Sequence, residues 1–398
     1  MNSNRKNLAI LFFTMVVIML GFGMVIPVMP FYIKSFGASG KALGALMAVY
    51  GVMQFIFAPI WGGLSDRYGR KPILIVGVLG NATAQLLMGL STDLWMLFAA
   101  RALAGILSSA TLPTAMAYIS DTTSHEQRGG GMGMIGAAMG VGMVLGPGLG
   151  GWLAGDSLSY PFFLAAALSV IALLLVWLIL PEPPRERLPE PYAKVSRWRM
   201  LVQALSGPIG VLLFMSFLLT FGITNFESVF GLYAADRYGY GPQQVGTVLT
   251  FIGLVSAVAQ GGLTGPMTRR FGEVAIIRGA LLCSALGFVL MTLPETTLGI
   301  YLVTGFFILS NAMLNPSVAS LISKRTPYPQ GVSMGINNSF LSLGRIIGPL
   351  WAGFAYDMRL NMPYYSGAII LFFGFLVSLT SLSPVESKLP KDVPPINT

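Results

Sequence analysis

The chain has 398 residues, of which 54% are hydrophobic and 10% are charged, and its formal net charge is +9. A soluble domain carries about 25% charged residues, so this composition excludes a soluble enzyme, a disordered protein and a coiled coil. The single cysteine, Cys283, excludes an internal disulfide, and the single histidine, His125, excludes a histidine cluster. The sequence shows no metal-ligand cluster, nucleophile–base pair or phosphate-binding loop, so we expect no enzyme activity, no metal and no cofactor.

Apolar runs long enough to cross a bilayer follow one another along the chain. A membrane helix needs about 20 mostly apolar residues. The first run is too long for a signal peptide and has no small-residue cleavage site, so we interpret it as an uncleaved helix. The sequence therefore predicts an all-α membrane protein with twelve transmembrane helices, near residues 8–31, 42–64, 72–91, 94–118, 130–153, 159–180, 207–233, 243–265, 274–293, 297–322, 331–355 and 362–383.

The basic residues between these runs predict the orientation of the helices. With the N-terminus inside, 18 of the 24 Lys and Arg residues fall in inner segments, and Lys34, Lys41, Arg237 and Arg359 fall in outer ones. Cytoplasmic loops carry such an excess of basic residues, so both termini are expected in the cytoplasm. Because topology accounts for the clustered positive charge, no nucleic-acid partner is expected.

The two halves of the chain repeat one another around a polar, proline-rich linker that holds a short interfacial helix or none. Gly146-Pro147 in the fifth span matches Gly348-Pro349 in the eleventh, an offset of 202 residues. We therefore predict two pseudo-symmetric six-helix bundles around a midplane cavity, an arrangement that suits alternating access. The predicted N-terminal bundle, cytoplasmic linker, C-terminal bundle and cytoplasmic tail occupy residues 1–180, 181–206, 207–384 and 385–398.

The loop after the second span carries charges at a dense, fixed spacing. Its aspartate can pair with the neighbouring arginines or with the positive N-terminus of the eleventh span, so the loop would act as a latch that holds one conformation and releases another. The alternative is an ordinary positive-inside loop with a turn glycine. The latch residues are Gly62, Asp66, Arg67, Gly69, Arg70 and Lys71.

The fifth span carries small residues four apart together with a proline. Such spacing allows close helix packing, and the proline bends the helix, although ordinary packing would also explain the glycines. This second motif consists of Gly142, Gly146, Pro147, Gly150 and Gly151.

The latch loop resembles the signature loop of the major facilitator superfamily, and the second motif resembles the antiporter motif of its drug:proton antiporters. GFGMVIPVMPFY at 21–32 is similar to tetracycline and multidrug exporters, and FGITNFESVFGLYAADRYGY at 221–240 resembles Gram-positive multidrug exporters. The aspartates that tetracycline pumps carry in the first and third spans have no counterpart here. The resemblance implies a monomeric transporter of a bacterial cytoplasmic membrane that exchanges small molecules for protons.

Glu227 is the one acidic residue well inside a predicted span. Burial favours the protonated form of a carboxyl group unless a cation lies close, so a proton and a cationic substrate would compete for it. Arg345 and Arg101 are candidate charge partners, and Arg101 lies in a motif that resembles one implicated in proton coupling. The alternatives are a structural Glu227–Arg345 bridge and an Arg101 that snorkels to the interface.

Eight further polar residues lie within the spans and either line the cavity or bridge helices. We hypothesise proton-coupled efflux of lipophilic, cationic drugs or amphiphiles. The alternatives are export of tetracycline or of one endogenous solute, such as a sugar or a lipid-like molecule, and a non-transporting membrane receptor. The cavity candidates are Gln54, Gln85, Asn225, Gln260, Asn311, Asn315, Asn337 and Asn338.

Overall fold

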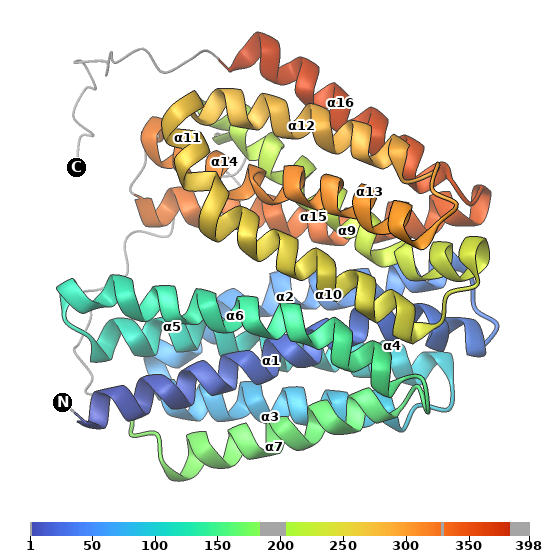
Figure 1. Cartoon of the computed structure of the whole chain (residues 1–398). Coiled ribbons are helices and arrows are strands. Elements are labelled where there is room, and N and C mark those ends of the chain that lie inside the picture. The colour runs from blue at the N-terminus through green and yellow to red at the C-terminus, as the bar shows by residue number, and fades with distance from the viewer. Residues whose placement is uncertain (1, 184–203, 328–329, 383–398) are drawn as a thin grey trace.

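The computed structural model describes residues 2–183, 204–327 and 330–382, and these residues form helices joined by short loops (Figure 1). Each of the twelve predicted spans is present, so the predicted fold class is confirmed. The helices of the first half are α1 (Asn2–Ser35), α2 (Gly40–Tyr68), α3 (Arg70–Gly89), α4 (Leu94–Leu107), α5 (Thr111–Thr122), α6 (His125–Leu153) and α7 (Tyr160–Leu178).

The second half repeats this order. Its helices are α9 (Gly210–Tyr238), α10 (Pro242–Val258), α11 (Thr264–Phe271), α12 (Glu273–Leu290), α13 (Thr297–Ala312), α14 (Leu314–Arg325), α15 (Gln330–Met358) and α16 (Met362–Ser381). The predicted linker helix and tail lie outside the described residues, and the predicted domain boundaries stay predictions.

Prolines break three of the spans into consecutive helices. A proline ring removes one backbone donor and clashes with the carbonyl four residues earlier. Pro113 accordingly follows the 3₁₀ turn Ser108–Ala110 between α4 and α5, and Pro316 follows the break between α13 and α14. The π-helical turn Ala259–Leu263 between α10 and α11 precedes Pro266 in the same way.

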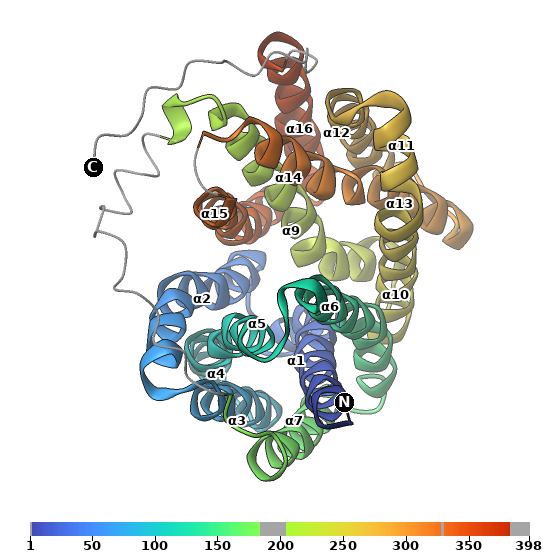
Figure 2. The same cartoon turned by 90° about the vertical axis from the view of Figure 1, so that its left-hand side faces the viewer.

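The helices pack as two bundles with the same internal pairing. In the first bundle α1 lies along α6 and α3 lies along α7; in the second α9 lies along α15 and α12 lies along α16. Seen end-on, the blue-to-green bundle and the yellow-to-red bundle lie one above the other (Figure 2). The backbone repeats as well, because Gly37 and Gly239, 202 residues apart, both end their helices with φ near +67°.

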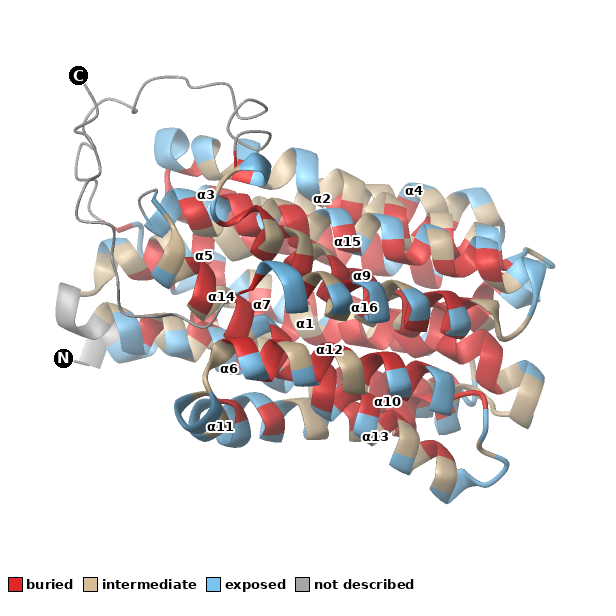
Figure 3. Ribbon diagram, turned by 90° about the horizontal axis from the view of Figure 1, so that it is seen from above, coloured by how far each residue is buried: buried red, intermediate tan, exposed pale blue. Residues whose placement is uncertain are grey.

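Buried and exposed residues alternate along the helices, so that each helix has a buried and an exposed side (Figure 3). Many of those exposed positions are large and apolar, including Trp95 at 68% and Ile369 at 69% exposure, which suits contact with lipid. Eleven spans within the described residues are long and apolar enough to cross a membrane. The twelfth, α15, is more polar because it lies between α9 and α2 at the junction of the bundles.

The described parts of the two bundles touch across one half of the molecule and diverge in the other. We call the end where α1 begins and α16 ends the termini end, and the opposite end the far end (Figure 1). Across the far half, α2 packs on α15 and α6 packs on α10. A Cβ on Gly151 would lie 2.8 Å from Gly246 Cα, and a Cβ on Gly44 would lie 3.4 Å from Gly353 Cα. Gly246 stands 202 residues after Gly44, and Gly353 stands 202 residues after Gly151, so the same small-residue contact occurs twice.

At the termini end, the same helices diverge. Within the described residues, a Cβ on Gly62 or Gly63 of α2, or on Gly331 or Gly335 of α15, would meet nothing within 4 Å. The structure is therefore closed at the far end and open between α2 and α15 at the termini end.

Candidate functional site

A cavity of about 370 Å³ lies between the bundles. Helices of both bundles contribute to its wall, which is largely apolar. The side chains from the first bundle are Met19, Phe22, Ile26, Met47, Tyr50, Gly51, Gln54, Arg101, Leu112, Met139 and Met143. Those from the second are Leu219, Thr220, Ile223, Thr224, Glu227, Ser228, Asn315, Leu341, Arg345 and Pro349.

Glu227 enters the cavity because of its place on α9. Residues three, four and seven apart lie on one face of a helix, and Thr220, Ile223 and Glu227 form such a face on the cavity wall. Phe226, the residue before Glu227, is instead buried in the core. Glu227 is half-buried, and its carboxylate makes no hydrogen bond or ion pair with any residue that the structure describes. Its carboxyl group is thus available to a ligand or a proton.

Arg101 points into the cavity from α4, and its side chain is 3% exposed. Its guanidinium lies over the Tyr50 ring, 4.6 Å from the ring centre, and Nη2 donates to Met47 Sδ at 3.5 Å. Nε is buried without a hydrogen-bond partner in the described part of the chain. This placement is interior, not the snorkelling position near the membrane interface that was the alternative.

Arg345 reaches the cavity from α15 in the other bundle, and it is exposed to the cavity space. It interacts electrostatically with Tyr50 and Glu227. No ion pair joins Arg345 to Glu227 within the described ranges, so the two groups are near each other without forming the static bridge that was the alternative.

Two of the eight polar candidates line the cavity, Gln54 from α2 and Asn315 from α14. Asn225 instead donates from Nδ2 to the Pro363 carbonyl at 2.9 Å, which joins α9 to α16.

The remaining candidates also lie elsewhere. Asn337 accepts a hydrogen bond from Ser216 at 2.6 Å, which joins α15 to α9. Gln85 is buried against α1 beside Gly21, and Asn311 is buried in the second bundle. Gln260 and Asn338 are exposed, away from the cavity wall.

Tyr50 was not among the predicted site residues, although it contacts Arg101 and interacts with Arg345. Helical spacing could have indicated that Tyr50 faces the cavity, because Met47, Tyr50 and Gln54 stand three and four residues apart on α2 and all line it. A tyrosine at the centre of a membrane span with a polar residue one turn away marks a polar helix face.

Polar contacts across the far end were also not anticipated. Lys34 Nζ pairs with Asp236 Oδ1 at 2.5 Å, and the Tyr356 hydroxyl donates to the other oxygen of Asp236. Asp357 at the end of α15 accepts from the backbone N–H groups of Gly40 at 2.7 Å and Lys41 at 2.9 Å. A carboxylate at a helix N-terminus is stabilised by the orphan N–H groups and the helix dipole, so Asp357 ties α2 to the opposite bundle.

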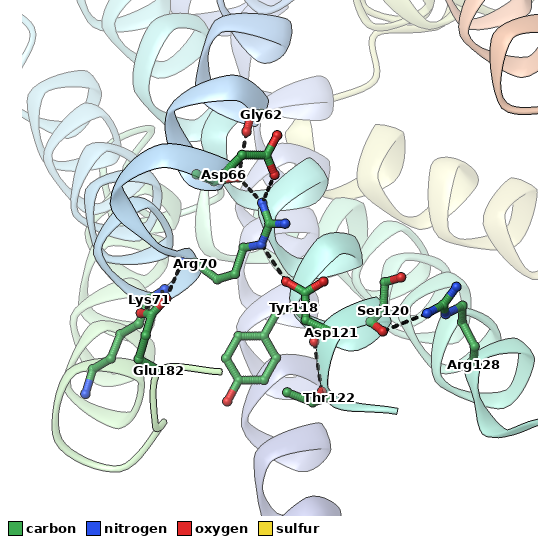
Figure 4. A network of polar contacts seen from close by, with 11 residues as sticks. Gly62, Asp66, Arg70, Lys71, Tyr118, Ser120, Asp121, Thr122, Arg128 and Glu182 are labelled. Atoms are coloured by element: carbon green, nitrogen blue, oxygen red, sulfur yellow. Dashed lines mark hydrogen bonds and ion pairs between the residues drawn. The ribbon is translucent and has the colours of Figure 1, made fainter. Parts of the chain in front are cut away.

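The latch residues form a network inside the first bundle (Figure 4). Arg70 lies between two aspartates: it pairs with Asp66, and its Nε donates to Asp121 Oδ2 at 2.8 Å. Glu182, which follows α7, accepts from the backbone N–H groups of Arg70 at 2.6 Å and Lys71 at 2.9 Å and so caps α3. Asp66 has no partner on α15 among the described residues, and its function as a latch stays a prediction.

The other latch residues lie in the turn between α2 and α3 or in the last turns of α2. Gly69 has φ of +111°, a conformation that favours glycine. The Gly62 carbonyl accepts from the Ser65 hydroxyl at 2.8 Å, and Arg67 lies over the neighbouring Tyr68 ring.

The second bundle repeats this ion pair with its charges exchanged. Glu273 stands 203 residues after Arg70, and Lys324 stands 203 residues after Asp121. Lys324 pairs with Glu273, which also accepts from the Ser320 hydroxyl at 3.0 Å. The geometry of the contact is retained while the polarity is reversed.

The second motif packs α6 against α1. A Cβ on Gly142 would lie 2.7 Å from the Val16 carbonyl oxygen, and a Cβ on Gly146 would lie 2.8 Å from Gly23 Cα. A Cβ on Gly150 would lie 2.7 Å from Met24 Cα. Gly151 faces α10 instead, so the motif serves both the interior of the bundle and the far-end contact between bundles. Pro147 lies inside α6.

Two pseudo-symmetric helical bundles, closed at one end around a partly polar cavity, define a membrane transporter of the alternating-access class. The family model of the Major Facilitator Superfamily matches residues 11–349. The chain belongs to this superfamily, whose members move small molecules across membranes.

Relatives match over nearly the whole chain. Multidrug resistance protein 1 of Bacillus subtilis is 32% identical, and the match covers 98% of this chain and 99% of the relative. Quinolone resistance protein NorA of Staphylococcus aureus is 27% identical, with 94% and 96% covered. The crystal structure of a bacterial homologue of the human lysosomal transporter Spinster, inward-facing and occupied, has a TM-score of 0.82 at 15% identity, with 96% and 97% covered.

Proposed function

We propose that the protein exports lipophilic, cationic drugs or amphiphiles across the cytoplasmic membrane of a bacterium in exchange for protons, as a monomer. One observation carries this proposal: Glu227 lies on the wall of the interbundle cavity without a protein partner among the described residues. The names of the relatives, which are multidrug and quinolone resistance proteins, support drugs as the substrate class.

The orientation follows from the positive-inside bias. The sequence assigns 18 of the 24 basic residues to the inner segments, which share a side with the termini, so this side is taken as the cytoplasm. The described conformation is then open to the cytoplasm and closed to the outside by the far-end contacts. A drug would enter the cavity from the cytoplasm or the inner leaflet, and rocking of the bundles would expose it outside.

Proton coupling follows from competition at one carboxyl group. An ionised Glu227 attracts a cationic group, and a proton that arrives from outside removes that attraction and favours release there. Reopening inward returns the proton to the cytoplasm, where the group ionises again. The inward proton gradient thus drives export without a direct proton–drug contact.

The test uses inside-out vesicles that contain the protein, an imposed pH gradient and a fluorescent cationic dye. We expect Glu227→Gln to abolish gradient-driven dye transport, because the amide retains the shape of the side chain and cannot ionise. Glu295→Gln, the same change at an exposed far-end loop, should leave transport intact. Wild-type transport by Glu227→Gln would overturn the assigned role of Glu227.

A further inference from the structure

The charge of the cavity does not match a site built for simple cations. Three charged side chains line it within the described residues: Arg101, Arg345 and Glu227. Two are positive and one is negative. Protonation of Glu227 would leave both arginines without any negative counterpart on the wall. A monocation therefore meets net positive charge in this cavity.

Arg101 is desolvated and lacks an anionic partner. Its side chain is 3% exposed, its Nε has no hydrogen-bond partner in the described chain, and its neighbours are a tyrosine ring and a thioether. A guanidinium remains charged even when buried, and a charge taken out of water without a partner is costly. A wall residue of a cavity whose buried charged group has an unsatisfied donor is the arrangement expected of a ligand-binding group.

Arg345 faces the same space from the other bundle. It interacts electrostatically with Tyr50, the residue over which Arg101 lies. The Tyr50 side chain thus stands near both guanidinium groups. Planar guanidinium groups donate paired hydrogen bonds that fit a carboxylate, which makes arginine the residue best suited to bind this group.

The apolar part of the cavity wall determines what kind of body the ligand has. Methionine and aromatic side chains make up much of the first bundle's share, and the thioethers of Met19, Met139 and Met143 adapt to different apolar shapes. The cavity therefore fits a lipophilic body with a polar end group.

We propose that Arg101 and Arg345, together with Tyr50, form a subsite for the carboxylate of an amphiphilic substrate, so that zwitterions are preferred over simple cations. The cationic group of the same molecule is placed toward Glu227, which lies near Arg345. This assignment rests on the proposed export function, because it names the substrate class of the same cavity. An anion held by both arginines would also connect the two bundles.

The test is equilibrium binding to the purified full-length protein, followed by fluorescence anisotropy of two dyes at one pH and without a gradient. Rhodamine 110 carries a free carboxylic acid, and rhodamine 123 is its methyl ester, so the pair differs at the carboxyl group alone. We expect wild type to bind rhodamine 110 about tenfold more tightly, the effect of a hydrogen-bonded charged group.

Four variants separate the subsite from general effects. Arg345→Gln and Arg101→Gln should each weaken rhodamine 110 binding about tenfold, with rhodamine 123 binding unchanged or tighter. Retained rhodamine 123 binding also shows that the cavity is folded. Arg345→Lys should fall between, because a lysine keeps the charge and loses the paired donors. Arg359→Gln, at an exposed loop away from the cavity, should match wild type.

Equal binding of the two dyes by wild type would overturn the subsite. A preference for rhodamine 110 over rhodamine 123 that persists in both glutamine variants would overturn it as well. Because the binding assay needs no proton gradient, its result is independent of vesicle transport. Failure of gradient-driven efflux with a retained carboxylate preference would refute proton-coupled export and leave the subsite standing.

Discussion

Removing the carboxylate of Asp357 should open the far end of the molecule. Asp357 accepts two backbone N–H groups at the first turn of α2, on the opposite bundle. Replacing a carboxylate or hydroxyl cap of a helix N-terminus by alanine costs about 0.5–2 kcal/mol. Because Asp357 is exposed to solvent, we take about 1 kcal/mol, which shifts the ratio of closed to open far ends about fivefold.

The assay is a spin-label distance measurement across the far end. Labels at Asp156→Cys and Glu295→Cys, in exposed loops of the first and second bundle, would be placed in a Cys283→Ser background. We expect Asp357→Ala to raise the ratio of the long-distance to the short-distance population about fivefold, in line with the loss of one cap. The matched control is Asp93→Ala, since Asp93 precedes α4 without a side-chain cap bond and does not cross between bundles.

One result would contradict this role of Asp357. If Asp357→Ala and Asp93→Ala gave the same distance distribution, the Asp357 contact would not contribute to closure. A loss of the closed population in both variants would show a general effect of removing negative charge from the far end.

Two further variants address the bundle contacts. Gly151→Leu should lengthen the same far-end distance, because a side chain there meets the Gly246 backbone. The control Gly133→Leu should leave the distance unchanged, because Gly133 is exposed on the same helix and a Cβ there meets nothing within 4 Å in the described structure. Equal effects of the two variants would refute the steric argument. Glu273→Lys should lower the thermal unfolding midpoint by placing like charge beside Lys324, and adding Lys324→Glu should restore it; a midpoint unchanged by Glu273→Lys alone would show that the pair is not stabilising.

Most of what could be predicted about the fold came from the length of the apolar runs. All twelve spans were predictable because each needs about 20 apolar residues, whatever its neighbours. The repeat was predictable because its prolines and glycines serve local backbone needs, such as the positive φ of Gly239. The breaks before Pro113 and Pro266 were not predicted, because a membrane helix with proline can kink, form a 3₁₀ turn or form a π turn.

The site was predictable in kind and less so in detail. Glu227 stood out because an acid inside a span is costly anywhere. Which amides face the cavity depends on the rotation of each helix about its axis, which packing sets. Asn225 lies two residues from Glu227 and therefore on a different face, where it bonds to α16. The contact of Asp357 with Gly40 joins residues 317 apart, and no local pattern marks it.

The exchanged polarity of the Arg70–Asp121 and Glu273–Lys324 pairs affects how the duplicated halves assemble. Two similar sets of helices inserted into one bilayer can exchange partners, since their apolar faces are alike. An assembly that placed α3 beside α14 would set Arg70 against Lys324, and α12 beside α5 would set Glu273 against Asp121. Each wrong neighbour brings like charges together, so the sign of the charge distinguishes the helices of one half from those of the other.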